Sequence, residues 1–240
     1  MGTARKLVCG RMQYITAVMF SPAMQPVASS SPLPSEALAP ALCFPILTLE
    51  ERSLTPALGY VFNRKWLEPY ESIVSILWKF KTANALPGYA LARLMGPRVD
   101  PYEGVVPKVE AIDFERLRST LNLPAKAVRV ALLPALQHRP RCESFRYCRR
   151  CIAGGYHSAL YQIERIAVCP VHSSPLESAC RKCGYEAPYL LNVRLLETSY
   201  RCANCGARYG SKKWSPDRLR PMSWEDRRAI TRAHIERGLL

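Results

Sequence analysis

The stretch between Cys148 and Cys205 decides the fold, because pairs of metal-ligating side chains recur along it. In chain order the four pairs are Cys148-Arg149-Arg150-Cys151, Cys169-Pro170-Val171-His172, Cys180-Arg181-Lys182-Cys183 and Cys202-Ala203-Asn204-Cys205. Two ligands separated by two residues lie on one turn and can point at a common ion. A tetrahedral ion needs two such pairs, so these segments predict two bound zinc ions.

The lengths between the pairs suggest how they combine. The intervening segments have 17, 7 and 18 residues, so a pair, a long gap and a second pair occur twice. The simplest assignment is sequential. Site one is then Cys148, Cys151, Cys169 and His172, and site two is Cys180, Cys183, Cys202 and Cys205. An interleaved cross-brace, as in ubiquitin-ligase-like modules, is the alternative that spacing leaves open.

Both predicted sites are structural and not catalytic. A catalytic zinc keeps one position open for water, whereas each of these sites has four protein ligands. A thioredoxin-like redox role would need one Cys pair in a strand-to-helix context, which is not seen here. Gly184 and Gly206 follow two of the pairs, where the chain must turn tightly and glycine tolerates left-handed angles. We therefore expect two structural Zn²⁺ ions and no enzyme activity.

The remaining cysteines and histidines have no partner at ligand spacing. Cys9, Cys43 and Cys142 are interpreted as structural or incidental. His157 is interpreted as a core or surface imidazole, with a spare zinc ligand as the alternative. Grouped cysteines favour metal binding over a disulfide framework and indicate a reducing, cytoplasmic setting. Because DNA is among the partners predicted below, we expect the protein to be associated with the nucleoid. No stretch approaches the length of uninterrupted apolar sequence that spans a membrane.

The chain is basic, and the excess is uneven. Formal net charge is +15, and residues 139–240 contain 19 basic and 9 acidic residues. Such a surplus favours phosphate-rich partners such as DNA, or an acidic protein surface. Basic and aromatic residues after site two suit phosphate contact and stacking, and a solvated tail is the alternative. The candidate DNA contacts are Arg208, Lys212, Lys213, Trp214, Arg218 and Arg220.

Two pairs of short helices are predicted before the zinc region. Residues 70–83 place apolar side chains on one helical face, and a second helix runs from Pro87 to Gly96. Downstream, Asp113 can cap a helix, and Pro124 opens its partner after a break at Asn122. Each pair is helix-turn-helix-like, although such pairs also form ordinary cores.

These observations predict a mainly α fold with small zinc-ribbon-like β elements, in which a helix-turn-helix-like half precedes tandem zinc fingers. Four regions follow: a Pro-, Ser- and Ala-rich, poorly ordered leader (1–55), a helical region (66–138), a tandem zinc-finger region (142–210) and a basic tail (211–240). The tail should end in a helix that Ser223 caps. Its apolar stripe is thin, so we expect it to dock on a partner.

Three segments together resemble the TniQ family. They are Glu71-Ser72-Ile73-Val74-Ser75-Ile76-Leu77 with Ala83-Asn84, the run from Phe145-Arg146-Tyr147-Cys148 through Gly155-Tyr156-His157-Ser158 to Val168-Cys169-Pro170-Val171-His172, and Leu176 with Cys180-Arg181-Lys182-Cys183-Gly184. The resemblance covers roughly residues 66–210. It implies an accessory role in choosing or engaging the target site during DNA transposition. It also implies an AAA+ transposition ATPase and a transposase as partners, with a CRISPR effector complex as a further partner of some members.

Overall fold

Short helices make up most of the regular structure in the computed structural model, which describes residues 60–132, 140–211, 214–215 and 220–236. In chain order they are η4 (Arg64–Trp66), α1 (Ile73–Asn84), α2 (Gly88–Ala92), η5 (Arg93–Met95), η6 (Val109–Ala111), α3 (Phe114–Leu121), α4 (Ala125–Ala131), α5 (Arg149–Ala153), η7 (Ala159–Gln162), α6 (Val193–Glu197) and α7 (Trp224–Glu236). Extended pairing in this part of the chain consists of isolated antiparallel bridges. The predicted predominance of helix is confirmed. The predicted leader, 1–55, lies outside the described residues.

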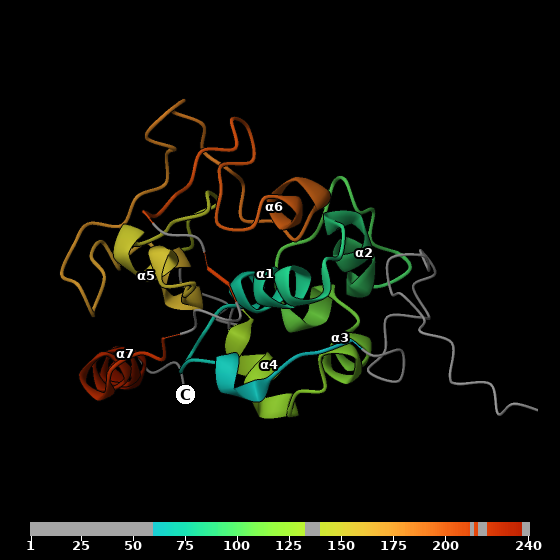
Figure 1. Cartoon of the computed structure of the whole chain (residues 1–240), viewed down its shortest axis with the longest axis horizontal. Helices are drawn as coiled ribbons and strands as arrows, with labels where there is room; N and C mark the ends of the chain where they lie inside the picture. Colours follow the sequence, from blue (N-terminus) through green and yellow to red (C-terminus); the bar gives the residue numbers. More distant parts are fainter. Residues whose placement is uncertain (1–59, 133–139, 212–213, 216–219, 237–240) are drawn as a thin grey trace, which may run out of the picture. The chain divides into compact units, whose positions relative to one another are not determined.

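Helix α1 is the centre of the helical half (Figure 1). Ser72 caps it, because the Ser72 hydroxyl accepts a hydrogen bond from the Ser75 N–H at 3.2 Å. Ala85 ends it in the left-handed conformation, with φ of 52°. Its first eight residues, 73–80, are all buried, so α1 is covered on every side and not along one face as its apolar pattern predicted. Surrounding elements therefore depend on α1 for their packing.

The two predicted helix pairs are present. Pro87 precedes α2, which continues directly into η5, and Asp113 caps α3 by accepting from the Arg116 N–H at 3.0 Å. Asn122, with φ of 50°, separates α3 from α4 in the tight turn that the sequence indicated. These caps and breaks are local signals, so they set the helix boundaries without help from distant residues.

An ion pair is enclosed within α1 and the turn before it. The Lys79 ammonium lies 2.6 Å from a Glu71 carboxylate oxygen, and both side chains are 1% exposed. Lys79 also donates to the Trp66 carbonyl, and the Ser75 hydroxyl donates to Glu71, both at 2.6 Å. Burial raises the pKa of Glu71, and the nearby Lys79 charge opposes that rise. The pair satisfies polar groups that would otherwise be costly to bury.

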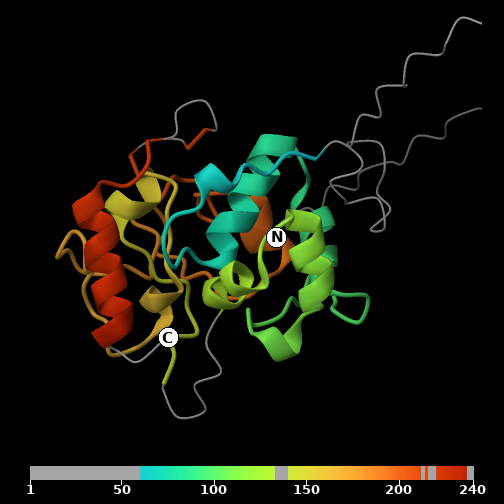
Figure 2. The same cartoon turned by 90° about the horizontal axis from the view of Figure 1, so that it is seen from below.

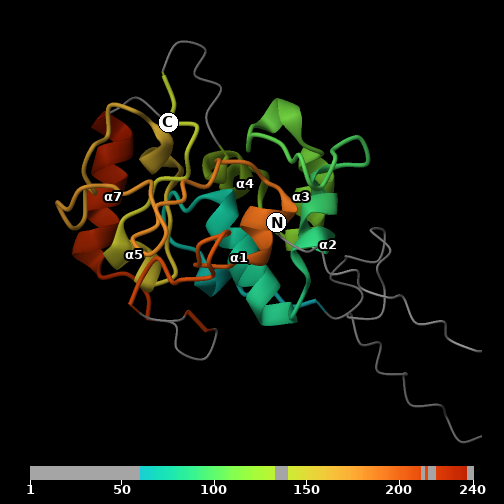
Figure 3. The same ribbon diagram turned by 90° about the horizontal axis from the view of Figure 1, so that it is seen from above.

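The helical half and most of the zinc region share one hydrophobic core. The Trp78 indole N–H of α1 donates to the Leu195 carbonyl of α6 at 2.8 Å. Helix α6 also packs against α2, where a Cβ on Gly88 would lie 2.6 Å from the Glu197 backbone nitrogen. Glycine is thus required by the close approach of two backbones. Figures 1 and 3 show α6 beside α2.

Helix α7 corrects a prediction, because its thin apolar stripe packs on its own chain. Ile230 is fully buried and joins the cluster around site one, and His234 stacks on Tyr70 with ring centroids 3.7 Å apart. Ser223 caps the helix as predicted, accepting from the Asp226 N–H at 3.1 Å. Figure 2 shows α7 on the side of the zinc region away from α3. None of the helices in the described ranges has both the length and the apolar character that crossing a bilayer requires.

Candidate metal centres

Three of the four ligand pairs lie on turns that share the same backbone geometry. An antiparallel bridge closes each turn, pairing Val168 with Pro175, Ala179 with Glu186, and Arg201 with Arg208. The first ligand follows the first bridge residue, and the second ligand comes three positions later. The next residue is left-handed each time: Ser173, Gly184 and Gly206 have φ of 49°, 70° and 68°. The two glycines were predicted from sequence, whereas Ser173 was missed because serine seldom adopts this conformation.

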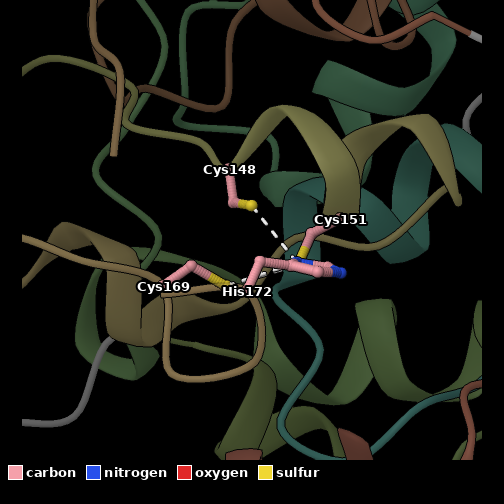
Figure 4. A group of neighbouring side chains, drawn as sticks. All are labelled: Cys148, Cys151, Cys169 and His172. Carbon is pink, nitrogen blue, oxygen red and sulfur yellow. Dashed lines mark hydrogen bonds between the residues drawn. The ribbon is translucent and has the colours of Figure 1, made fainter. Parts of the chain in front are cut away.

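The fourth pair is held differently, at the start of α5. Cys148 is the N-cap residue of this helix and Cys151 lies within it. The Cys151 side chain therefore projects from the first turn of α5, and the helical backbone sets the direction of that side chain. Site one combines this helix with the turn that carries Cys169 and His172 (Figure 4). Site two combines the two glycine-containing turns.

The eight predicted ligands gather into two groups of four, in sequential order and not interleaved. Within each group all candidate ligand atoms lie within 4.8 Å of one another. In site one, Nδ1 of His172 lies 3.4 Å from the Cys148 sulfur, 3.2 Å from that of Cys151 and 3.6 Å from that of Cys169. In site two, the sulfurs of Cys180 and Cys205, and those of Cys183 and Cys202, are 3.7 Å apart.

These separations fit a tetrahedral zinc ion. Bonds of about 2.3 Å to sulfur and about 2.0–2.1 Å to nitrogen imply edges of about 3.8 Å between sulfurs and about 3.6 Å between sulfur and nitrogen. The measured distances are close to these edges. Three thiolates with one imidazole, as in site one, and four thiolates, as in site two, are both ligand sets of structural zinc. The two clusters could therefore hold two zinc ions.

Hydrogen bonds at the sulfurs favour the thiolate form of some ligand cysteines and disfavour it in others. A backbone N–H from Tyr185 lowers the pKa of Cys183 to about 6. In site one, hydrogen bonds from Cys151 and Cys169 lower the pKa of Cys148, and hydrogen bonding to Cys148 and Cys169 raises that of Cys151. Thiolates this close to one another repel, so the cysteines of a cluster cannot all be ionised unless a cation lies between them.

Polar side chains around the ligands were missed from sequence. The Tyr161 hydroxyl donates to the Cys151 sulfur at 3.1 Å and lies 3.5 Å from that of Cys169. At site two the Asn204 side-chain amide donates to the Cys183 sulfur at 3.7 Å, and the Asn204 backbone N–H donates to the Cys202 sulfur at 3.4 Å. Such contacts orient ligands and hold them in place. Asn204 lies between two ligands and could have been inferred from its position, but Tyr161 lies on η7 and depends on the fold.

In the described ranges the other cysteine and histidines lie outside both groups. Cys142 accepts a hydrogen bond from Arg146 at 3.1 Å, while Cys9 and Cys43 precede the described residues. His157 is fully buried and forms a core contact: its Nε2–H donates to the Arg146 carbonyl at 2.8 Å, and Nδ1 faces the Ser72 hydroxyl at 2.6 Å. Burial lowers its pKa to about 4, so the ring is neutral.

Among the described candidate DNA contacts, Arg208 and Trp214 line one hollow, whereas Arg220 lines a different one. Arg208 and Arg220 are exposed, but Arg208 lies beside site two and Arg220 lines a hollow beside site one with Glu68 and Asp226. Trp214 is 5% exposed and packs against Trp66 with ring centroids 6.0 Å apart. Its ring is thus part of the core and not a surface stacking platform. Lys212, Lys213 and Arg218 lie outside the described residues.

Comparison with known proteins adds no family assignment. The chain matches no protein-family model and none of the curated proteins. The geometry of the two clusters is therefore the firmest guide to function.

Proposed function

We propose that this chain is a zinc-stabilised, non-enzymatic accessory protein of DNA transposition that engages target DNA, the transposition ATPase, or both. The observation that carries the proposal is the pair of four-ligand clusters, in which every coordination position has a protein side chain. A zinc ion held this way stabilises a fold and has no free position to activate water. The two ions hold rigid turns whose outer residues are available to bind a partner.

The TniQ-like segments support the transposition part of the proposal. The first of them begins α1, and the second includes residues 155–158 between α5 and η7. Although about 85 residues apart in sequence, they pair through the Glu71–Ser158 bridge and a hydrogen bond of 2.7 Å from the Ser72 N–H to the His157 carbonyl. If this chain shared the fold of the TniQ family, the segments that resemble the family would be expected to pack together in this way.

The basic surface supports engagement of DNA. Arg149, Arg181, Lys182 and Arg208 all line one hollow beside site two. Protein contacts with DNA phosphates come largely from such side chains, and they are weakened by salt. We therefore place this protein at the nucleoid, next to a transposase and its ATPase.

The test combines two binding measurements on purified, zinc-loaded protein. Affinity for DNA is measured by fluorescence anisotropy between about 50 and 200 mM salt, a range over which several phosphate contacts lose orders of magnitude in affinity. Binding to an AAA+ transposition ATPase is measured by co-purification and calorimetry. Binding to either partner supports the proposal, and binding to neither contradicts it.

The second candidate is a zinc-stabilised protein-interaction adaptor that does not touch DNA. It is favoured by large apolar side chains on the surface: Tyr102 is 69% exposed and Trp224 is 66% exposed. Aromatic residues are enriched at the centres of protein interfaces. An adaptor would bind the ATPase with DNA absent, and changing salt would leave that affinity nearly constant. Loss of ATPase binding in Trp224→Ala, with DNA binding absent from the wild type, would identify this function.

A further inference from the structure

Two hollows on the surface of the zinc region meet at Arg208. The larger, of about 600 Å³, lies between the end of α1 and the turn of Cys202 and Cys205. The smaller, of about 210 Å³, lies beside the turn of Cys180 and Cys183. Arg208 lines both. Lys81 and Arg201 add positive charge to the larger hollow, and Arg149, Arg181 and Lys182 add it to the smaller.

Most of these cations are not neutralised by carboxylates. Glu197 lines the larger hollow but pairs with Lys81 at 3.2 Å. Glu177 pairs with Arg181 through two bonds of 2.8 Å. Within the described part of the chain, no carboxylate forms an ion pair with Arg149, Lys182, Arg201 or Arg208. These last four side chains are therefore the ones that an anion could bind.

Backbone carbonyls orient two of these four side chains. The Arg149 Nε donates to the Tyr209 carbonyl at 3.3 Å, and the Arg201 Nη1 donates to the Gly206 carbonyl at 2.9 Å. Each contact uses one guanidinium N–H and leaves others for a ligand. A guanidinium that is already oriented loses less side-chain entropy when it binds phosphate bidentately.

The zinc centre lowers the positive charge without cancelling it. Four thiolates around Zn²⁺ in site two have a net charge of about −2. The six basic side chains outnumber the two paired carboxylates by four, so a surplus of two positive charges remains after the zinc centre is included. A surplus spread over two adjoining hollows suits a chain of regularly spaced anions better than one small ion.

We infer that the two hollows form one track for a nucleic-acid backbone, with phosphates bound on both sides of Arg208. This inference rests on the DNA engagement in the proposed function and names the surface that provides it. Exposed Ala85 and Pro87 line the larger hollow and suit contact with sugar. The tertiary structure brings Lys81 of α1 and Arg149 at the start of α5 to this track beside Arg208, the one of the three that the sequence had offered as a candidate.

The test compares two double variants that remove equal charge. Arg208→Ala with Lys182→Ala changes the track, and Arg165→Ala with Arg232→Ala changes exposed residues elsewhere. Anisotropy with a labelled duplex of arbitrary sequence is measured over about 50–200 mM salt. The track variant should bind at least about tenfold more weakly at the lowest salt, and its salt slope should fall by about 2. The control should change affinity by less than about threefold. Zinc content and circular dichroism should match the wild type in both variants.

Each other outcome overturns a defined statement. If wild-type protein binds DNA and the two variants weaken it equally, the track is wrong while DNA engagement stands. If wild-type protein binds no DNA, DNA engagement and the track both fail. If polyglutamate at equal charge concentration displaces DNA from the wild type as effectively as unlabelled DNA does, the surface is a general acidic-polymer site and the inference fails.

Discussion

The Ser72 hydroxyl joins the helical half to the zinc region by donating to Nδ1 of His157 across 2.6 Å. The direction of this bond follows from the histidine, whose Nε2–H donates to the Arg146 carbonyl and whose Nδ1 must therefore accept. The same hydroxyl oxygen accepts from the Ser75 N–H at the start of α1. One side chain thus caps a helix and satisfies a buried imidazole 85 residues away.

Ser72→Ala should destabilise the protein, because it removes the cap and leaves a buried acceptor without a donor. We expect a loss of about 2–3 kcal/mol in the free energy of unfolding, measured by denaturant titration of the zinc-loaded protein. Ser119→Ala removes an exposed hydroxyl that donates to the Arg116 carbonyl, and should cost less than about 0.5 kcal/mol. Equal losses in the two variants would show that the bond to His157 has little energetic weight.

Zinc content should separate the two sites. Wild-type protein should bind two zinc ions, and a strong chelator should remove much of its folded structure, measured by circular dichroism. Cys169→Ser should leave about one ion per chain by mass spectrometry of metals, since only site one loses a ligand. Cys142→Ser should keep two, because Cys142 lies outside both clusters. Retention of two ions by Cys169→Ser, or an intact fold after chelation, would contradict the assignment.

Gly155 and Gly184 offer a matched test of packing against backbone strain. Both have positive φ, 77° and 70°. A Cβ at Gly155 would lie 1.9 Å from Cδ1 of Trp214, whereas a Cβ at Gly184 would meet nothing within 4 Å. Gly184→Ala should therefore cost about 1–2 kcal/mol from strain alone. Gly155→Ala should cost at least about 2 kcal/mol more, because the indole must move out of the core. Similar losses in denaturant titrations would show that Trp214 moves freely.

Stability should fall in acid partly because buried histidines stay neutral. Burial lowers the pKa of His234 to about 4. In the unfolded chain the pKa of His234 is about 6.5. Between about pH 6.5 and about pH 4 the unfolded chain therefore binds a proton at His234 that the folded chain does not, so stability decreases as pH falls. From pH 7 to pH 5 the wild type should lose about 2 kcal/mol more than His234→Gln, measured by denaturant titration. Both proteins retain all eight zinc ligands, so metal loss affects both. Parallel pH profiles would contradict this prediction.

Local features were readable from sequence because neighbouring residues determine them. Asp113 and Asn122 set the ends of α3, and the spacing of Cys180 and Cys183 places two ligands on one turn whatever surrounds them. Tyr161 and His157 show the limit of this reasoning. The first contacts ligand sulfurs and the second bonds to Ser72, and both relationships depend on how distant segments pack.

The sequence by itself determined the eight candidate ligands, the helix pairs and the basic character of the chain, since each depends on residues a few positions apart or on composition, whereas the fold decided that the ligands group sequentially. The tertiary structure decided that Trp214 is a core residue, that α7 packs against site one, and that Lys81 and Arg149 meet Arg208 around two hollows. The physical reason is that burial and charge clustering are properties of surfaces formed by distant segments, which no local pattern specifies.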